Sequence, residues 1–505
     1  MFTASENTTL LIILIAFGVL AWGYYRAQPY GKLGILAWLQ SVVLMLPWLI
    51  FFGLFTLGIY LNLVGILLFL VISTGLYIYL GKQLRAVDQE AENNSQSESS
   101  ESGTSDSPAP PTTPPVPPAP PSRSNFPANS LSLTSLTPIP VEDIKILQGI
   151  FGVDTFFAIE TIPFQDGAIF KGNLRGDPEI VHQQLTANLE AKFGERYRLF
   201  LVENSDSKPV VIVSPRQNDP APVNISQKVL MAVLLVTTLA TCLETAGFLL
   251  GFDLLQEPQR YPQALPIAAG IWLILGAHEI AHQWQARRHQ VKFSWPFFIP
   301  ALQLGSFGGF NAFETLLPNR KVLFDVAFAG PATGGCISLL FLFLGLVLSH
   351  TGSLFQMPAE FFKGSILVGT MARIILGDRL QQAVIDVHPL MVIGWLGLVI
   401  TAINLMPAGQ LDGGRIVQAI YGRKMAGRAT FATFIFLAIA SFANPIALYW
   451  AVVILILQRN LERPSLNELT EVDDTRAAWG LLALFLMLAT LLPLNPALAG
   501  RLGIG

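Results

Sequence analysis

The chain has 505 residues, of which 52% are hydrophobic and 13% are charged. Soluble globular proteins carry about 25% charged residues, so this low share excludes an ordinary soluble enzyme and favours a protein with several membrane spans. The net charge of −3 gives no indication of a nucleic-acid partner. The two cysteines, Cys242 and Cys336, both lie in apolar runs, which excludes a disulfide framework and a zinc site made of thiolates.

The N-terminal part, residues 1–85, contains three apolar runs at 10–25, 33–53 and 59–80. Each is close to the roughly 20 residues that cross a bilayer as a helix. The first run has neither the basic start nor the cleavage site of a signal peptide, so we interpret it as a retained membrane helix. Residues 86–139 are rich first in Ser and Glu and then in Pro, which predicts a disordered linker.

Residues 140–226 have the pattern of a small soluble α+β domain. Four apolar or alternating segments predict strands: Phe156–Phe164, Ala168–Gly172, Tyr197–Glu203 and Pro209–Val213. Between the second and third of them, Pro178–Phe193 has apolar residues at helical spacing and a proline at its start, which predicts a helix. The expected order is β-β-α-β-β, and no residue pattern in it indicates catalysis.

From residue 227 the chain is apolar again, and we predict a membrane core at 227–463 and a C-terminal membrane helix within 464–505. The candidate spans are 227–251, 265–286, 322–349, 388–406, 429–442, 445–458 and 478–495. The run 364–376 is short, and the Gly-rich run 295–317 has prolines at both ends, so we expect neither to be a full span. The expected fold is a polytopic α-helical membrane protein with a small soluble domain. If the spans alternate, Lys and Arg gather on one side, and the positive-inside rule places that side and the soluble domain in the cytosol.

Residues 278–282 read His-Glu-x-x-His within a hydrophobic helix. His278 and His282 are four residues apart, so they lie on one face, where both imidazoles can bind one metal ion. Glu279 lies beside them, where it can take a proton from a metal-bound water. Such side chains are costly in an apolar span unless they face a cavity or a ligand. A buried His–Glu pair that only holds helices together is the weaker interpretation of this pentad.

A catalytic zinc site normally has three protein ligands. The other four histidines lie in the soluble domain, after the helix or at span ends, so they are poor candidates. A better candidate is Asp412, in a segment where Pro and Gly residues break a helix at membrane depth, because broken backbone is tolerated there only around a cavity or a site. Asn404, in the same segment, can bind substrate backbone or an oxyanion. Taken alone, the segment also fits an ordinary surface turn.

These two motifs, His278-Glu279-x-x-His282 and Asn404-x-x-Pro407-x-x-x-Leu411-Asp412-Gly413, together resemble the site-2 protease family of intramembrane zinc metalloproteases. Phe328–Ala332 is similar to the segment that follows the family's catalytic helix, and Gly305–Phe310 is similar to its Gly-rich re-entrant hairpin. The resemblance covers about 265–425. It implies one Zn²⁺ per chain, held by His278, His282 and Asp412, with Glu279 as the general base. From the hairpin and the helix break we predict substrate contacts at five residues: Gly305, Phe307, Gly308, Asn404 and Pro407.

Gly172-Asn173-Leu174-Arg175 resembles an element of the plant plastid members required for chloroplast development and of their cyanobacterial relatives. The presence of Arg415 after Gly413-Gly414 is also similar to that branch. The sequence does not indicate a role for this arginine. A strand end followed by a turn explains Gly172–Gly176 equally well. Because the first residues do not resemble a transit peptide, we expect a cyanobacterium-like source. The sequence does not decide between the plasma membrane and the thylakoid membrane as the location.

The predicted function is hydrolysis of peptide bonds in or near transmembrane helices of membrane proteins, as in regulated intramembrane proteolysis. The expected partners are the lipid bilayer and transmembrane substrates, with the oligomeric state left open. A prenyl-protein type of protease resembles this chain less, since it implies a Glu ligand and no Glu lies in a predicted span after Glu314. The non-enzymatic alternatives are a zinc transporter, which needs ligands along several spans, and a catalytically silent scaffold, which would usually lose a ligand or the base.

Overall fold

The computed structural model describes residues 139–501 apart from Gln165, Ser205, Gln303, Ala443 and Arg459, together with scattered positions between Gly23 and Gln83. The chain divides into two compact units, Met1–Asn129 and Ser130–Gly505. The scattered positions of the first unit are nearly all helical. Most of the predicted N-terminal spans, and all of the predicted linker except Ile139, lie outside the described residues.

The second unit begins with a small sheet module. It consists of α4 (Val141–Gln148), β1 (Phe156–Phe164), β2 (Gly167–Leu174), α5 (Pro178–Phe193), β3 (Tyr197–Glu203) and β4 (Pro209–Pro215), followed by a short 3₁₀ turn, Arg216–Asn218. The strands form an antiparallel sheet in the order β1-β2-β4-β3. The predicted β-β-α-β-β order is therefore confirmed. Asp177 caps α5 directly before Pro178, and Leu185 and Leu189 of α5 are buried in the core of the module.

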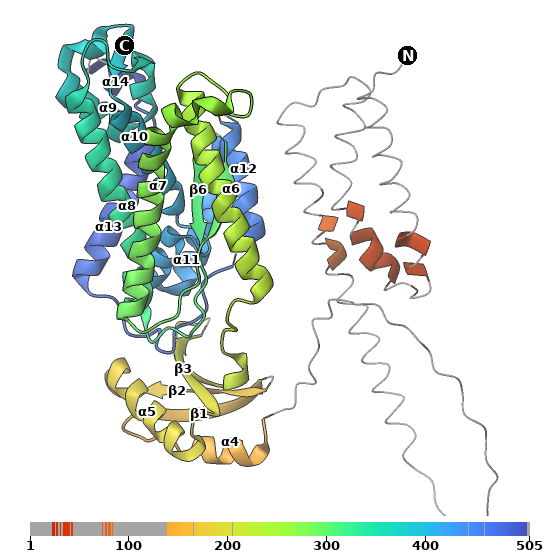
Figure 1. Ribbon diagram of the computed structural model, residues 1–505. Helices are drawn as coiled ribbons and strands as arrows, with labels where there is room; N and C mark the ends of the chain where they lie inside the picture. The colour runs from red at the N-terminus through yellow and green to blue at the C-terminus, as the bar shows by residue number, and fades with distance from the viewer. Residues whose placement is uncertain are drawn as a thin grey trace, which may run out of the picture. The chain divides into compact units, whose positions relative to one another are not determined.

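The module is joined to the membrane core through its edge strand. Leu201 of β3 donates from its amide to Leu466 O at 2.8 Å and accepts from the amide of Glu468 at 2.9 Å. Lys321, at the start of a core helix, lies 3.3 Å from Glu179 of α5. Figure 1 shows the module at one end of the helices. Pairing the edge strand in this way also covers backbone groups that would otherwise be open to association with other chains.

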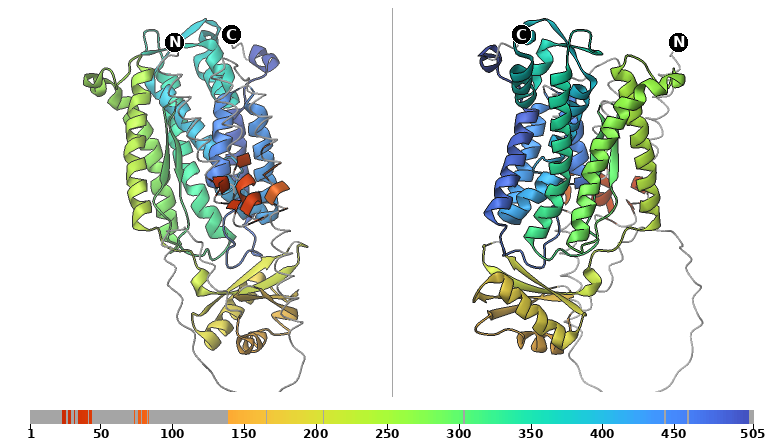
Figure 2. Two further views of the ribbon diagram at one scale, coloured as in Figure 1. Left: turned by 90° about the vertical axis from the view of Figure 1, so that its right-hand side faces the viewer. Right: turned by 60° about the vertical axis from the view of Figure 1, so that its left-hand side comes forward.

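The core is built of helices whose axes run roughly side by side (Figure 2). Four of them are long and apolar enough to cross a membrane: α6 (Ile225–Leu249), α7 (Tyr261–Arg288, preceded by the turn Pro258–Arg260), α8 (Arg320–Leu348) and α13 (Asp474–Leu491). α10 (Pro389–Asn404) and α12 (Pro445–Val453, continued by a π turn to Gln458) are shorter and also apolar. The chain is thus a polytopic helical membrane protein, as the sequence predicted.

Several other predicted segments take the form that their sequence patterns indicated. The run 364–376 forms only the 11-residue helix α9 (Ile366–Leu376), and the run 295–317 contains the hairpin β5 (Phe297–Ala301) and β6 (Gly305–Phe310). The remaining elements are the short strand pair β7 (Phe355–Pro358) and β8 (Val384–Val387), the 3₁₀ turns Ala359–Gly364 and Gly377–Gln381, and α14 (Pro496–Arg501). Between the predicted spans 429–442 and 445–458, Asn444 caps the N-terminus of α12 and Pro445 is its first residue.

One predicted span differs from the structure. The run 429–442 is not a separate helix but the second part of α11 (Asp412–Ala440), which is interrupted at Gly422, where φ is +78°. A left-handed backbone conformation is accessible to glycine without steric cost, so the chain bends there and continues as a helix. The first part of α11, before Gly422, begins with buried residues and packs against α8.

Candidate metal centre and active site

The helix α7 carries the His-Glu-x-x-His motif deep within the protein. Successive turns place His278 and His282 on the same face, and they are 8% and 1% exposed. Gly330 and Gly334 of α8 lie against these rings. A Cβ on Gly330 would overlap Nε2 of His282 and lie 2.7 Å from Nε2 of His278, and a Cβ on Gly334 would lie 3.1 Å from Nδ1 of His278. The absence of side chains at these two positions therefore makes the space for the imidazoles.

Asp412 reaches the same space from α11. α10 ends at Asn404, a short turn follows, and Asp412 is the first residue of the next helix. The turn is tight, and it leaves no room for side chains at the two glycines. A Cβ on Gly413 would overlap Leu405 O, and one on Gly414 would overlap Gly409 O. The N-terminus of a helix also favours a negatively charged group. The Gly-Gly pair after Asp412 thus lets the backbone fold back and present the carboxylate to α7.

Three ligand atoms converge at this point. Nε2 of His278 and Nε2 of His282 are 3.1 Å apart, and they lie 3.3 and 3.4 Å from Oδ2 of Asp412. Ligands at the usual zinc distances of about 2.0–2.1 Å from a tetrahedral ion are about 3.3–3.4 Å from one another. Within the part of the chain that the structure describes, this is the one group of three or more His, Cys, Asp or Glu residues placed to share a metal ion. Its donor set and spacing fit zinc.

A hydrogen bond of Nδ1 fixes the tautomer and the orientation of the His282 ring. Nδ1–H of His282 donates to the carbonyl oxygen of Val326, on α8, at 2.7 Å. Because a carbonyl can only accept, Nδ1 carries the proton and Nε2 keeps its lone pair for a metal. Sequence reasoning did not identify Val326, since a backbone carbonyl leaves no signal in the residue type.

Glu279 is held by the end of the β5–β6 hairpin. The side-chain amide of Asn311, directly after β6, donates to Oε2 of Glu279 at 3.1 Å. A Cβ on Gly309 would lie 2.7 Å from Oε1, so this oxygen fits against bare backbone. Glu279 is 7% exposed. It lines a cavity of about 710 Å³ between α6, α7 and the start of β5, whose walls are mostly apolar and include Trp284, Trp295 and Phe298.

The residues predicted to bind substrate have different surroundings. Asn404 donates from its amide to Phe307 O at 2.9 Å and to Ile400 O at 2.8 Å, and Gly308 packs directly against it. The side chain of Phe307 stacks on Trp450 and is buried. Gly305, at the far end of β6, contacts Cys242 of α6. Pro407 lines another cavity, between α11 and α13. The structure thus packs Asn404 against Gly308, one residue before the Gly309 that contacts Glu279, and gives the other three different partners.

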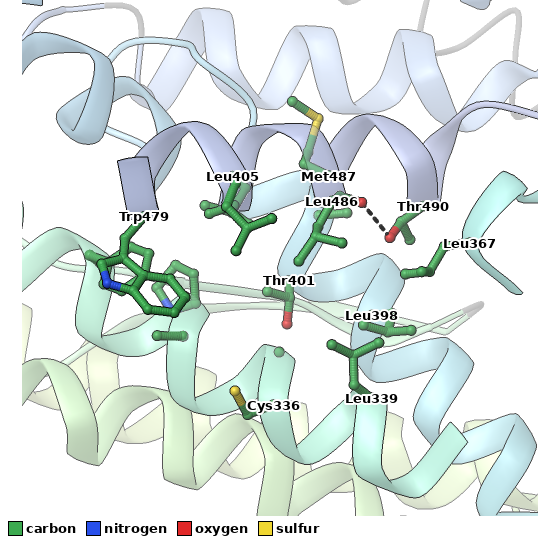
Figure 3. Close-up of a pocket in the computed structure, with 17 residues that line it drawn as sticks. Cys336, Leu339, Leu367, Leu398, Thr401, Leu405, Trp479, Leu486, Met487 and Thr490 are labelled. Carbon is green, nitrogen blue, oxygen red and sulfur yellow. Dashed lines mark hydrogen bonds between the residues drawn. The ribbon is translucent and has the colours of Figure 1, made fainter. Parts of the chain in front are cut away.

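A third, apolar pocket of about 280 Å³ lies between α8, α10 and α13, and Figure 3 shows the side chains that line it. Cys336 and Leu339 come from α8, Leu398 and Thr401 from α10, and Met487 from α13. Among the residues that the structure describes, all those lining it are uncharged. Unlike the metal centre, this pocket is lined by no carboxylate, imidazole or amine among the described residues.

The fold and this site define a polytopic membrane protein with a buried His-His-Asp centre and an adjacent carboxylate. These groups are typical of a membrane metallohydrolase. The profile of peptidase family M50 matches residues 266–443, and that of the EGY3 middle domain matches residues 145–220. The chain belongs to peptidase family M50, the site-2 protease family of zinc metalloproteases. This family membership confirms the resemblance predicted from the two motifs.

Three curated relatives from Arabidopsis thaliana illustrate the similarity. The probable zinc metalloprotease EGY2, chloroplastic, is 36% identical over 382 residues, covering 74% of this chain and 68% of the relative. The probable zinc metalloprotease EGY1, chloroplastic, is 34% identical over 423 residues, covering 76% and 77%. The probable zinc metallopeptidase EGY3, chloroplastic, is 34% identical over 376 residues, covering 70% and 65%. No solved structure matches the chain.

Proposed function

We propose that the protein is an intramembrane zinc metalloendopeptidase that cleaves peptide bonds in or near transmembrane helices of membrane-protein substrates. The observation that carries the proposal is the convergence of His278, His282 and Asp412 at zinc-ligand spacing, with Glu279 next to them on the same helix. Four such polar groups in an apolar core are costly unless a function retains them. The similarity to proteins named zinc metalloproteases supports the same conclusion.

The proposed roles follow from the chemistry of each side chain. His278, His282 and Asp412 hold the ion through two imidazole nitrogens and one carboxylate oxygen. A zinc ion held there would supply Lewis acidity. Glu279 is placed to take a proton from a water molecule and to pass it to the amide nitrogen that leaves. The burial of Glu279 keeps this proton transfer away from bulk solvent.

The cavity beside Glu279 offers a path for the substrate. It lies between α6 and α7, and its apolar lining suits a segment that arrives from the bilayer. A transmembrane helix has its carbonyls in hydrogen bonds, so the segment to be cut must first unwind. We propose that the unwound segment contacts Gly308 of β6 and Asn404 of α10, which pack against each other next to the Gly309 that contacts Glu279. Gly305, Phe307 and Pro407 then act by holding β6 and the α10–α11 turn in place.

The proposal is tested with the purified protein reconstituted into lipid vesicles together with a panel of single-span substrates tagged at both ends. We expect cleavage that yields two fragments ending within or beside the membrane segment. A zinc chelator is expected to abolish the cleavage, and added Zn²⁺ to restore it. Cleavage that continues unchanged in the chelator, or a lack of cleavage of the whole panel by zinc-loaded protein, would contradict the proposal.

We also propose that the end of the core that carries the sheet module faces the cytosol. Arg287 and Arg288 end α7, and Arg320 and Lys321 begin α8, at the end where Lys321 meets Glu179 of the module. An excess of cations in short loops marks the cytosolic side. A reporter enzyme fused after residue 216 of a truncated chain, expressed in a bacterial host, should be active only in the cytosol. Activity on the other side of the membrane would reverse the orientation.

A further inference from the structure

Arg415 forms a buried ion pair that the proposed reaction does not use. It lies three residues after Asp412 on α11 and is 2% exposed, and its partner Glu462 is 5% exposed. Nε of Arg415 donates to Oε2 of Glu462 at 2.9 Å, and Nη2 lies 2.8 Å from the same oxygen. The guanidinium also lies over the rings of Phe293 and Phe313, 5.5 and 5.1 Å from their centres. A buried ion pair contributes little net stability by itself, so its location calls for another explanation.

A third hydrogen bond of the guanidinium connects Arg415 to Asn311, the residue that contacts the proposed general base Glu279. Nη2 of Arg415 donates to the backbone oxygen of Asn311 at 2.6 Å. The side-chain amide of the same Asn311 donates to Oε2 of Glu279 at 3.1 Å and to Ser294 O at 3.2 Å. Asn311 is therefore fixed on its backbone by one partner and directs its amide to another. An unbroken chain of hydrogen bonds runs from Glu462 through Arg415 and Asn311 to Glu279.

The consequence concerns the geometry of Glu279. A glutamate side chain has three rotatable bonds, and a general base must stay within hydrogen-bond reach of the proton that it takes. Gly309 limits the position of Oε1 and the Asn311 amide limits that of Oε2. Arg415 belongs to the helix that begins with Asp412, so the same element that supplies a metal ligand also restrains the base.

We propose that Asn311 is a positioning residue for Glu279, and that the Arg415–Glu462 pair keeps Asn311 in place. The inference deepens the proposed function and rests on it. It assigns a role to Arg415, for which the sequence alone indicates none. The competing view is that Asn311 and the ion pair serve only to hold the hairpin and the segment around Glu462 together.

The experiment compares Asn311→Leu, which keeps the volume but lacks a donor, with Asn311→Gln, which keeps an amide. We expect Asn311→Leu to lower kcat by about 10- to 100-fold, the range found for groups that orient catalytic ligands, with KM and zinc content unchanged. Asn311→Gln should recover part of the loss. Asn467→Ala, which removes another buried Asn, is the control and should leave kcat unchanged. Unchanged kcat in Asn311→Leu, or a loss that tracks zinc release, would overturn the proposal.

The ion pair is tested with both partners replaced, Arg415→Met with Glu462→Met, because a single change would leave an unpaired buried charge. This double variant should lower kcat as Asn311→Leu does, and adding Asn311→Leu to it should cause no further loss. If the fold-loss of kcat in the triple variant equals the product of the losses in the double variant and in Asn311→Leu, the pair acts independently of Asn311.

A measurement without catalysis separates this inference from the proposed function. The changes in thermal unfolding temperature of Asn311→Leu, Glu279→Met and the combined variant should not add, because each single change removes the same hydrogen bond between the two side chains. Additive shifts would refute the contact. If the shifts are not additive but the wild-type protein cleaves nothing, the contact stands, the proposed function fails, and a role in positioning a base fails with it.

Discussion

Replacement of Glu279 by glutamine is expected to lower kcat for a transmembrane substrate by about 10²- to 10⁴-fold, the usual contribution of a general acid–base group. Glutamine has the same shape, and its oxygen can still accept the hydrogen bond from Asn311. It cannot take up a proton from water, so the attacking group is not formed and the leaving nitrogen is not protonated. The rate is measured with protein and substrate in the same vesicles, and zinc per chain is measured by mass spectrometry.

Zinc content should stay at the wild-type level in Glu279→Gln, since the three ligand side chains are untouched. The matched control is Glu244→Gln, which changes another buried glutamate, on α6, that accepts a hydrogen bond from the backbone of Leu254. This control should remain active. Near-wild-type cleavage by Glu279→Gln would refute the mechanism, and a loss of zinc in that variant would assign Glu279 a structural role instead. Retained activity would also exclude the silent-scaffold alternative while leaving the identity of the base unsolved.

Replacement of Gly330 by alanine is expected to disrupt zinc binding although Gly330 contributes no ligand. The new methyl group would overlap Nε2 of His282, the atom that faces Asp412 at 3.4 Å. The ring or the helix must shift, and the three ligand atoms would lose their common centre. We expect zinc affinity to fall by at least about 10- to 100-fold, as for other changes that misorient metal ligands, and activity to fall with it. Affinity is measured by competition with a fluorescent zinc chelator.

Two control variants accompany Gly330→Ala, one expected to lose zinc and one expected to keep it. Asp412→Ala removes a ligand outright and should lose both zinc and activity. Gly276→Ala introduces the same methyl group into α7 at a position where a Cβ has no neighbour within 4 Å, so it should bind zinc like the wild-type protein. Tight zinc binding by Gly330→Ala would mean that α7 and α8 can separate without cost. In that case the close packing of these helices does not shape the metal centre.

The metal centre illustrates how membrane helices come close enough to build a site. Gly394 and Gly397 of α10 face the backbone and side chain of α8, where a Cβ on Gly394 would lie 2.7 Å from Ser338 O. Small residues allow such contacts between helices in a membrane, where the hydrophobic effect does not drive association. The same device at Gly330 and Gly413 leaves room for imidazoles and for a turn. The site is thus made by missing side chains as much as by the polar ones.

The sequence by itself determined the membrane class, the order of the elements in the sheet module and the four residues proposed for catalysis. The low charge identified the class because a bilayer tolerates few ionised groups, and for the same reason His278, Glu279, His282 and Asp412 stood out. The four-residue spacing of the histidines is a local property of one helix, which the sequence alone can reveal. The break before Asp412 was likewise visible from its Pro and Gly residues.

Only the tertiary structure decided which residues surround the site. Asn311, Val326, Gly330 and Glu462 come from separate segments, and their meeting depends on how helices cross and how the hairpin is seated. Two of these contributions, a backbone carbonyl and a missing Cβ, leave no mark in the chemistry of the residue itself. The placement of Phe307 against Trp450 instead of the catalytic centre, and the path of the chain through Gly422, were equally beyond local pattern. Contacts between residues far apart in the chain are set by packing in three dimensions, which periodicity along one helix or strand does not encode.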